Sequence, residues 1–167
     1  PTPYHLYDEK GIRENAKKLK EAFSWNKGYR EYFAIKATPN PYILKILKDY
    51  GCGVDCASMT ELMMAYALDY KPEEIMFSSN DTPAEEYEYA AKIGATINLD
   101  DITHIDFLDK ILDGKFPETM SCRYNPGGFF KLGTSIMDNP GDAKYGMTHE
   151  QIIEAFKILK SKGVKHF

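Results

Sequence analysis

The residues best suited to chemistry are polar side chains at the carboxyl ends of short apolar runs. Lys36 follows Tyr32-Phe33-Ala34-Ile35 and precedes a segment that two prolines interrupt, so the run has the composition of a buried strand. Burying a lysine costs free energy unless the amine pairs with a partner or reacts with one. Position alone slightly favours the alternative, in which the Lys36 side chain extends from the strand end into water.

Alternation within the other apolar runs places further polar groups on a single face. Side chains point alternately to the two faces of a strand, so Asp55 shares a face with the small residues Gly53 and Ala57. Residues with the same placement on later runs are Ser78, Asn80, Thr96, Asn98, Asp100, Ser121, Arg123 and Asn125. An amine, a carboxylate, a guanidinium and amides at one rim favour an active site. The alternative is a set of structural ion pairs, such as Asp55 with Lys36 or with Arg123.

Glu61 has two compatible interpretations. It follows Ser58 by three residues, and this spacing predicts a capping box in which Ser58 caps a helix and Glu61 returns the hydrogen bond. The same carboxylate can also face a pocket at the strand ends.

The elements that must position these residues alternate between strand and helix at a spacing of roughly 20–30 residues. The predicted strands are 32–37, 53–57, 75–79, 95–99, 120–124 and 164–167, and the helices between them include 10–23, 102–112 and 152–160. Helix starts are marked by Asn40 before Pro41, by Thr82 with Glu85, and by Thr148 with Gln151. The pattern predicts an α/β fold of parallel strands, first a (β/α)8 TIM-type barrel and second a doubly wound open sheet.

Composition excludes several classes of function. The formal net charge of −4 gives no electrostatic footprint for nucleic acid or an anionic membrane surface. No apolar run approaches the length of a membrane span. Three cysteines suit a reducing cytoplasm, and Cys52 with Cys56 lacks the second pair that a metal site needs. We therefore expect no metal, no nucleic acid and no membrane partner.

The same residues carry a family resemblance that runs in order over nearly the whole chain. The Lys36 run resembles the cofactor-lysine strand of alanine-racemase-like barrel enzymes that use pyridoxal 5'-phosphate, and residues 51–62 resemble the next motif of their amino-acid decarboxylase branch. Asn98-Leu99-Asp100, Arg123-Tyr124-Asn125-Pro126-Gly127 and Lys144-Tyr145-Gly146 are similar to later motifs of that branch. The Arg-x-Asn-Pro-Gly segment is most similar to diaminopimelate decarboxylases, and the Cys-Ala-Ser-x-Thr-Glu segment is also close to ornithine decarboxylases.

The resemblance implies that Lys36 attaches pyridoxal phosphate covalently and acts as the catalytic lysine, in a partly desolvated strand end that lowers its pKa. It implies that Asp55, Glu61 and Arg123 line the pocket around the lysine and the cofactor. The implied reaction is decarboxylation of a small amino acid, meso-diaminopimelate, to L-lysine in lysine biosynthesis. The alternatives are an ornithine- or arginine-type decarboxylase and a non-catalytic, cofactor-binding or regulatory relative. The implied assembly is a cytoplasmic homodimer.

The resemblance also implies parts that these residues do not contain. A complete barrel needs about 250 residues, so we expect residues 1–167 to be the N-terminal part of a pyridoxal-binding barrel domain, without a second domain. The family's cofactor-stacking histidine, phosphate-binding loop, acidic partner of the pyridine nitrogen and C-terminal β domain are not in this sequence. We therefore expect the 167-residue chain alone to be inactive.

Overall fold

Five parallel strands form a single sheet whose spatial order equals their order in the chain, β1-β2-β3-β4-β5. The structure, a computed structural model, describes residues 2–127 and 145–167. The strands are β1 (Tyr32–Ala34), β2 (Gly53–Cys56), β3 (Ile75–Phe77), β4 (Thr96–Leu99) and β5 (Met120–Cys122). The helices are α1 (Glu9–Ala22), α2 (Pro41–Asp49), α3 (Met59–Ala67), α4 (Ala84–Ile93), α5 (Thr103–Leu112) and α7 (His149–Ser161).

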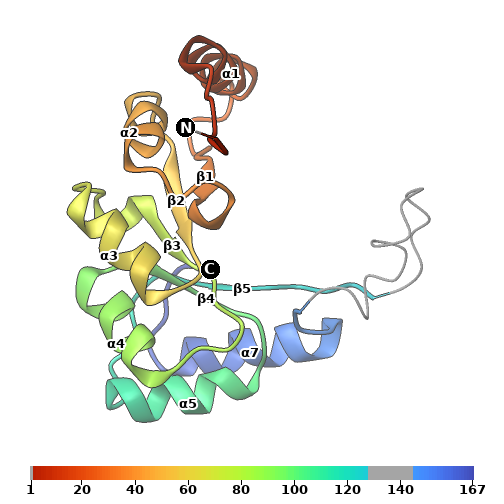
Figure 1. Cartoon of the computed structure of the whole chain (residues 1–167). Coiled ribbons are helices and arrows are strands. Elements are labelled where there is room, and N and C mark those ends of the chain that lie inside the picture. The colour runs from red at the N-terminus through yellow and green to blue at the C-terminus, as the bar shows by residue number, and fades with distance from the viewer. Residues whose placement is uncertain (1, 128–144) are drawn as a thin grey trace.

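The units follow one another along an arc, with helices α2 to α5 on its outer side and the strands inside (Figure 1). A doubly wound sheet would reverse its strand order at a switch point and carry helices on both faces. The uninterrupted order and the one-sided helices are instead those of consecutive units of a (β/α)8 barrel, which confirms the first of the two predicted folds.

The apolar side chains of the strands meet the helices and form the main core. Register pairs Val54 with Ile75, Phe77 with Ile97, and Leu99 with Cys122. Val54, Phe77, Ile97 and Leu99 are each 0% exposed and belong to one cluster with buried residues of α3, α4 and α5. Burying a side chain of this size contributes about 1.5–3 kcal/mol. The opposite side chains of the same strands are left on the inner face of the arc.

The element boundaries differ from the sequence-based predictions at several places. The first strand stops at Ala34, and a 3₁₀ turn over Ile35–Ala37 follows it. The predicted capping box at Thr82 is wrong, since α4 starts at Ala84 after Pro83 and has no side-chain cap. The predicted strand 164–167 is reduced to a bridge between Thr119 and His166. The caps at Asn40 and Thr148 are confirmed, whereas Lys144 lies outside the described residues.

Helix α1 packs mainly on α2 through a small second core and an exposed polar network. The core joins Ala16 of α1 to Ile43, Leu47 and Cys52.

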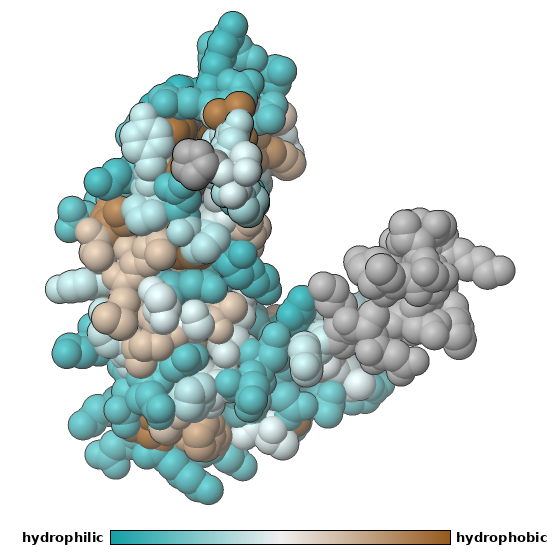
Figure 2. Space-filling model, in the orientation of Figure 1, coloured by the Kyte–Doolittle hydropathy of each residue, from teal (hydrophilic) through white to brown (hydrophobic). Residues whose placement is uncertain are grey.

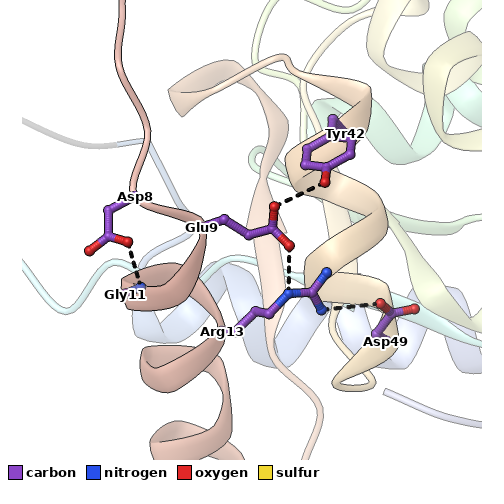
Figure 3. A network of polar contacts seen from close by, with 6 residues as sticks. All are labelled: Asp8, Glu9, Gly11, Arg13, Tyr42 and Asp49. Carbon is purple, nitrogen blue, oxygen red and sulfur yellow. Dashed lines mark hydrogen bonds and ion pairs between the residues drawn. The ribbon is translucent and has the colours of Figure 1, made fainter.

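In the network, shown in Figure 3, the Arg13 guanidinium contacts Glu9 at 2.9 Å and Asp49 at 3.5 Å, and the Tyr42 hydroxyl donates to Glu9 at 2.9 Å. Asp8 caps the helix by accepting from the Gly11 amide. Solvent-exposed ion pairs of this kind add little stability, so the small core carries most of the attachment.

Both ends of α3 are closed by side chains of the neighbouring helices. At its start, a Glu86 carboxylate oxygen from α4 accepts a hydrogen bond of 2.9 Å from the Met59 amide. Beyond its end, the Lys48 ammonium of α2 donates to the carbonyl oxygens of Leu68 at 2.9 Å and Asp69 at 2.6 Å. These contacts satisfy backbone groups that a helix end leaves without an intrahelical partner.

The outer surface is mostly hydrophilic, with apolar side chains gathered over α3 (Figure 2). Met63 and Tyr66 of that helix are 55% and 62% exposed. Within residues 2–127 and 145–167, the structure contains no helix with the length and apolar character needed to span a membrane.

Candidate active site

Lys36 lies directly after β1, at the carboxyl end of the sheet. The 3₁₀ turn is closed by a hydrogen bond of 3.0 Å from the Thr38 amide to the Ile35 carbonyl, and Ile35 is 0% exposed. The buried isoleucine therefore anchors the turn and directs its neighbour outward. The expected partial desolvation of Lys36 is not seen, because its side chain is exposed in this structure.

The inner face of the sheet holds an open hollow of about 390 Å³. Its lining residues are Tyr32, Asp55, Met76, Ser78, Asn98, Ser121, Cys122 and Arg123. Register explains the gathering, because Ala34 pairs with Asp55, Asp55 with Met76, and Asn98 with Ser121. Apart from Cys122, the lining residues of each strand share one alternation and therefore one face. A volume of this size lies within the range of small-molecule sites, about 300–1,000 Å³.

The lining residues of the hollow include the carboxylate of Asp55, which pairs in register with Ala34 just before the lysine turn. Its side chain accepts a hydrogen bond from the Ser78 hydroxyl on the next strand. Burial raises the pKa of Asp55, and the Ser78 hydrogen bond and the charges of Lys36 and Arg123 oppose that rise. Among the described residues no ion pair joins Asp55 to Lys36 or Arg123, so the alternative of a structural pair at Asp55 is not realised.

A chain of polar contacts crosses the floor of the hollow from β5 to β4 and back. The Ser121 hydroxyl donates to the Asn98 side-chain oxygen at 2.9 Å, and the Asn98 amide nitrogen donates to Asp100 Oδ1 at 2.8 Å. The Arg123 guanidinium then meets Asp100 Oδ2 at 3.4 Å. Asp100 is 2% exposed, whereas the Arg123 side chain is 38% exposed. Arg123 is thus anchored on a buried carboxylate and still faces the hollow.

Glu61 does not line the hollow. One of its carboxylate oxygens accepts from the Ala57 amide at 2.7 Å, while the Glu61 amide donates to the Ser58 hydroxyl at 3.4 Å. The cap that the sequence predicted is present, with the returned bond one residue earlier than in a standard capping box. The structure therefore supports the capping interpretation of Glu61, and its placement among the pocket residues is not reproduced.

Sequence reasoning placed Ser78, Asn98 and Asp100 on the polar face but left them out of the selected site residues. The structure brings two of them into contact with selected residues, Ser78 with Asp55 and Asp100 with Arg123, and Asn98 reaches Arg123 through Asp100. The available signal was their alternation in phase with those residues.

A separate cavity of about 120 Å³ lies between α1 and the start of β2, with Lys20, Tyr29 and Cys52 among its lining residues. It is smaller than typical small-molecule sites and contains none of the predicted residues.

Comparisons with known proteins agree with this architecture. Residues 9–165 match the family described as "Pyridoxal-dependent decarboxylase, pyridoxal binding domain". Protein TabA of Pseudomonas amygdali pv. tabaci is 33% identical over 167 residues, which cover 100% of this chain and 38% of that protein. Diaminopimelate decarboxylase of Thermoplasma acidophilum is 29% identical over 168 residues, covering 99% of this chain and 40% of the relative.

The fold also matches solved structures. Diaminopimelate decarboxylase of Helicobacter pylori, in complex with L-lysine, superposes with a TM-score of 0.86 at 30% identity. The match covers 97% of this chain and 41% of that one. The chain thus spans about 40% of the length of the proteins that it resembles.

Proposed function

The chain belongs to the pyridoxal-dependent decarboxylase family, and from this premise we propose that it forms part of an enzyme that decarboxylates meso-diaminopimelate to L-lysine. The cofactor of the family is pyridoxal phosphate. The observation that carries the proposal is the placement of Lys36 at the carboxyl end of β1, at the same edge of the sheet as Asp55 and Arg123.

The residues present fit this cofactor in the chemistry of their side chains. An exposed primary amine at Lys36 is accessible to an aldehyde. The Arg123 guanidinium, held by Asp100, presents positive charge to an anionic ligand, and the hollow next to it is polar on its floor. When bound, pyridoxal phosphate supplies the electron sink that accepts the electron pair left on the α-carbon as CO2 departs.

Each side chain then has a distinct proposed role. Lys36 would hold the cofactor covalently through its exposed amine. Asp55 supplies the carboxylate of the hollow, and the charge of Lys36 favours its ionised form. Arg123 orients an anionic group from the floor of the hollow. Glu61 contributes indirectly by fixing the turn between β2 and α3 that follows Asp55.

The choice of substrate rests on the relatives. Several relatives at about 30% identity carry the name diaminopimelate decarboxylase, and the solved structure from Helicobacter pylori contains L-lysine. A lysine/ornithine decarboxylase from Vibrio vulnificus matches at 17% identity and supports the fold alone. Ornithine is the second candidate substrate because the Cys-Ala-Ser-x-Thr-Glu segment resembles ornithine decarboxylases.

Release of CO2 by the full-length protein from meso-diaminopimelate, ornithine and arginine, measured in parallel, tests the proposal. We expect turnover with diaminopimelate to be at least tenfold faster than with the other two. That ratio corresponds to a difference of about 1.4 kcal/mol in activation free energy. A preference for ornithine would show that ornithine, and not diaminopimelate, is the substrate. Absence of turnover with all three amino acids would favour a non-catalytic relative.

Borohydride reduction followed by mass spectrometry tests the cofactor attachment separately. We expect the pyridoxyl mass on the peptide that contains Lys36, and loss of that mass in Lys36→Ala. Lys45→Ala, which removes another exposed lysine from α2, is the matched control and should keep it. A pyridoxyl group on any other lysine would refute the role of Lys36.

Further parts of the proposal concern the whole protein. We propose that residues 1–167 belong to one pyridoxal-binding barrel domain and that the 167-residue chain alone does not turn over substrate, because it spans about 40% of its relatives. Measurable turnover by the purified chain would contradict this. A homodimer in the cytoplasm is the proposed state, and light scattering of the full-length protein tests the dimer. The three free cysteines are compatible with a reducing compartment.

A further inference from the structure

The buried carboxylate beneath the hollow takes no part in the proposed chemistry beyond its contact with Arg123, although it is among the most enclosed charged groups described. Asp100 is 2% exposed and follows β4 directly. Burying a carboxylate is costly unless partners satisfy its oxygens. Its two oxygens have separate partners, Oδ1 the Asn98 amide and Oδ2 the Arg123 guanidinium. The carboxylate is therefore held in one orientation.

The backbone of Arg123 is fixed independently of this contact. Its amide donates to the Leu99 carbonyl at 2.9 Å, and its carbonyl accepts from the Met147 amide at 2.7 Å. Gly146 lies close by, since a Cβ added there would come within 3.3 Å of Arg123 Cγ. The stem of the arginine thus starts from a defined position, and the direction of its charged end depends on the partner it finds.

The charge of Asp100 also reaches beyond its own pair. Four groups act electrostatically or by hydrogen bonding on Asp55: Ser78, Lys36, Arg123 and Asp100. Arg123 lowers the pKa of Asp55 more strongly than Asp100 raises it. The position of the guanidinium therefore matters to the carboxyl that lies beside the lysine turn.

We propose that Asp100 is a positioning residue, which fixes the Arg123 guanidinium on the floor of the hollow beside Asp55 and is itself oriented by Asn98 and Ser121. The role deepens the proposed function and rests on it for its meaning in catalysis. Asp100 is not among the residues that line the hollow. It acts through Arg123, whose exposed part faces the hollow.

A titration distinguishes positioning from a merely local charge effect. The pKa of Asp55 is measured by ¹³C NMR of its side-chain carboxyl in cofactor-free, full-length protein, with Asp55→Asn to assign the signal. In Asp100→Asn the loss of the Asp100 charge alone would lower the pKa of Asp55. If Arg123 also leaves its place, the larger effect of the guanidinium is lost, and the pKa of Asp55 rises instead.

We expect the proton-binding constant of Asp55 to increase about twofold in Asp100→Asn, because the lost effect of the Arg123 charge outweighs the lost effect of the Asp100 charge in a solvent-connected site. Arg123→Gln should raise the pKa of Asp55 further, because Asp100 keeps its charge there, and the double variant should resemble Asp100→Asn alone. Asp106→Asn removes an equal charge from the exposed face of α5 and should leave Asp55 unchanged. An unchanged or lowered pKa of Asp55 in Asp100→Asn overturns the proposal.

Two further measurements cover the remaining outcomes. If Asp100→Asn does not fold, Ser121→Ala loosens the far end of the chain of contacts; a raised pKa of Asp55 supports the proposal, and any other result overturns it. In addition, Asp100→Asn and Arg123→Gln should each weaken binding of pyridoxal phosphate about tenfold, without further loss in the double variant. Additive losses would overturn a shared action. The NMR result needs no cofactor, so a failure of the proposed function leaves it interpretable.

Discussion

Replacing Gly53 by alanine should destabilise the amino end of the sheet and disturb the hollow from below. A Cβ at this position would lie 2.5 Å from the Glu74 carbonyl oxygen and 2.8 Å from a ring carbon of Tyr32. Neither neighbour is free to move, because the Tyr32 hydroxyl donates to the Glu73 carbonyl at 2.7 Å. The ring and the turn before β3 are therefore coupled, and the new methyl group must displace both.

The size of the effect follows from two opposing contributions. Overpacking of a filled site costs about 1–3 kcal/mol. A glycine-to-alanine change also restricts the unfolded chain, which stabilises the folded protein by about 0.4–1 kcal/mol. We expect a net loss of about 1–2 kcal/mol in the free energy of unfolding. For a domain of this size the loss corresponds to a fall of about 3–6 °C in Tm.

Urea and thermal unfolding of the variant provide the measurement. Gly28→Ala is the matched control, since the atom nearest to its Cβ would be the Asn26 side-chain oxygen at 3.6 Å, an ordinary contact. Tyr32→Leu combined with Gly53→Ala should show a coupling of at least about 0.5 kcal/mol, because the smaller side chain leaves room for the methyl group. Equal stability of the Gly53 and Gly28 variants would refute the packing argument.

Three further predictions concern charge, thiol reactivity and capping. Because burial raises the folded-state pKa of Asp55, ionisation of this carboxyl lowers the stability of the folded protein as pH rises above the unfolded-state pKa. Asp55→Asn can still accept the hydrogen bond from Ser78, so its stability relative to the parent protein should increase between pH 3 and pH 8 in urea titrations. Parallel pH profiles of the two proteins would contradict this. Burial raises the pKa of Cys122 to about 11 and raises that of Cys56 further. Alkylation of both thiols at pH 8 should therefore be at least about 100-fold slower than alkylation of a peptide thiol. Rapid labelling of the folded protein would show instead that the thiols are accessible. Asn40→Ala should lower the free energy of unfolding by about 1 kcal/mol, because Asn40 caps the helix that follows the lysine turn. Asn40→Ser keeps a side-chain acceptor and should retain most of the stability. Equal losses in both variants would exclude capping as the cause.

Much of the architecture was predictable because strand alternation and helix caps are local. Asp55, Asn98 and Arg123 were assigned to one face from the period of two, and parallel register then places them around one hollow. The cap at Asn40 followed from its side-chain oxygen and the proline after it. The family was predicted from the resemblance of the Lys36 run and residues 51–62 to known motifs, and the family match over residues 9–165 confirms it.

Other features depend on choices between local alternatives that residue types do not decide. The lysine run was extended to residue 37 because its composition suits a strand, but burial of Ile35 is achieved by a 3₁₀ turn, which exposes Lys36. Thr82 and Glu85 have capping-box spacing, yet Pro83 keeps an extended backbone and the helix begins one residue later. The pairing of Arg123 with Asp100 depends on side-chain direction, which sequence spacing leaves open.

The closure of α3 at both ends by its neighbours has a consequence for recombination between relatives. Because the groups that α3 contributes are backbone amides and carbonyls, exchange of residues 59–69 leaves them in place, whereas exchange of the neighbouring helices can remove Lys48 or Glu86. The βα unit that contains α3 is therefore not an independent module, since side chains of α2 and α4 close its ends.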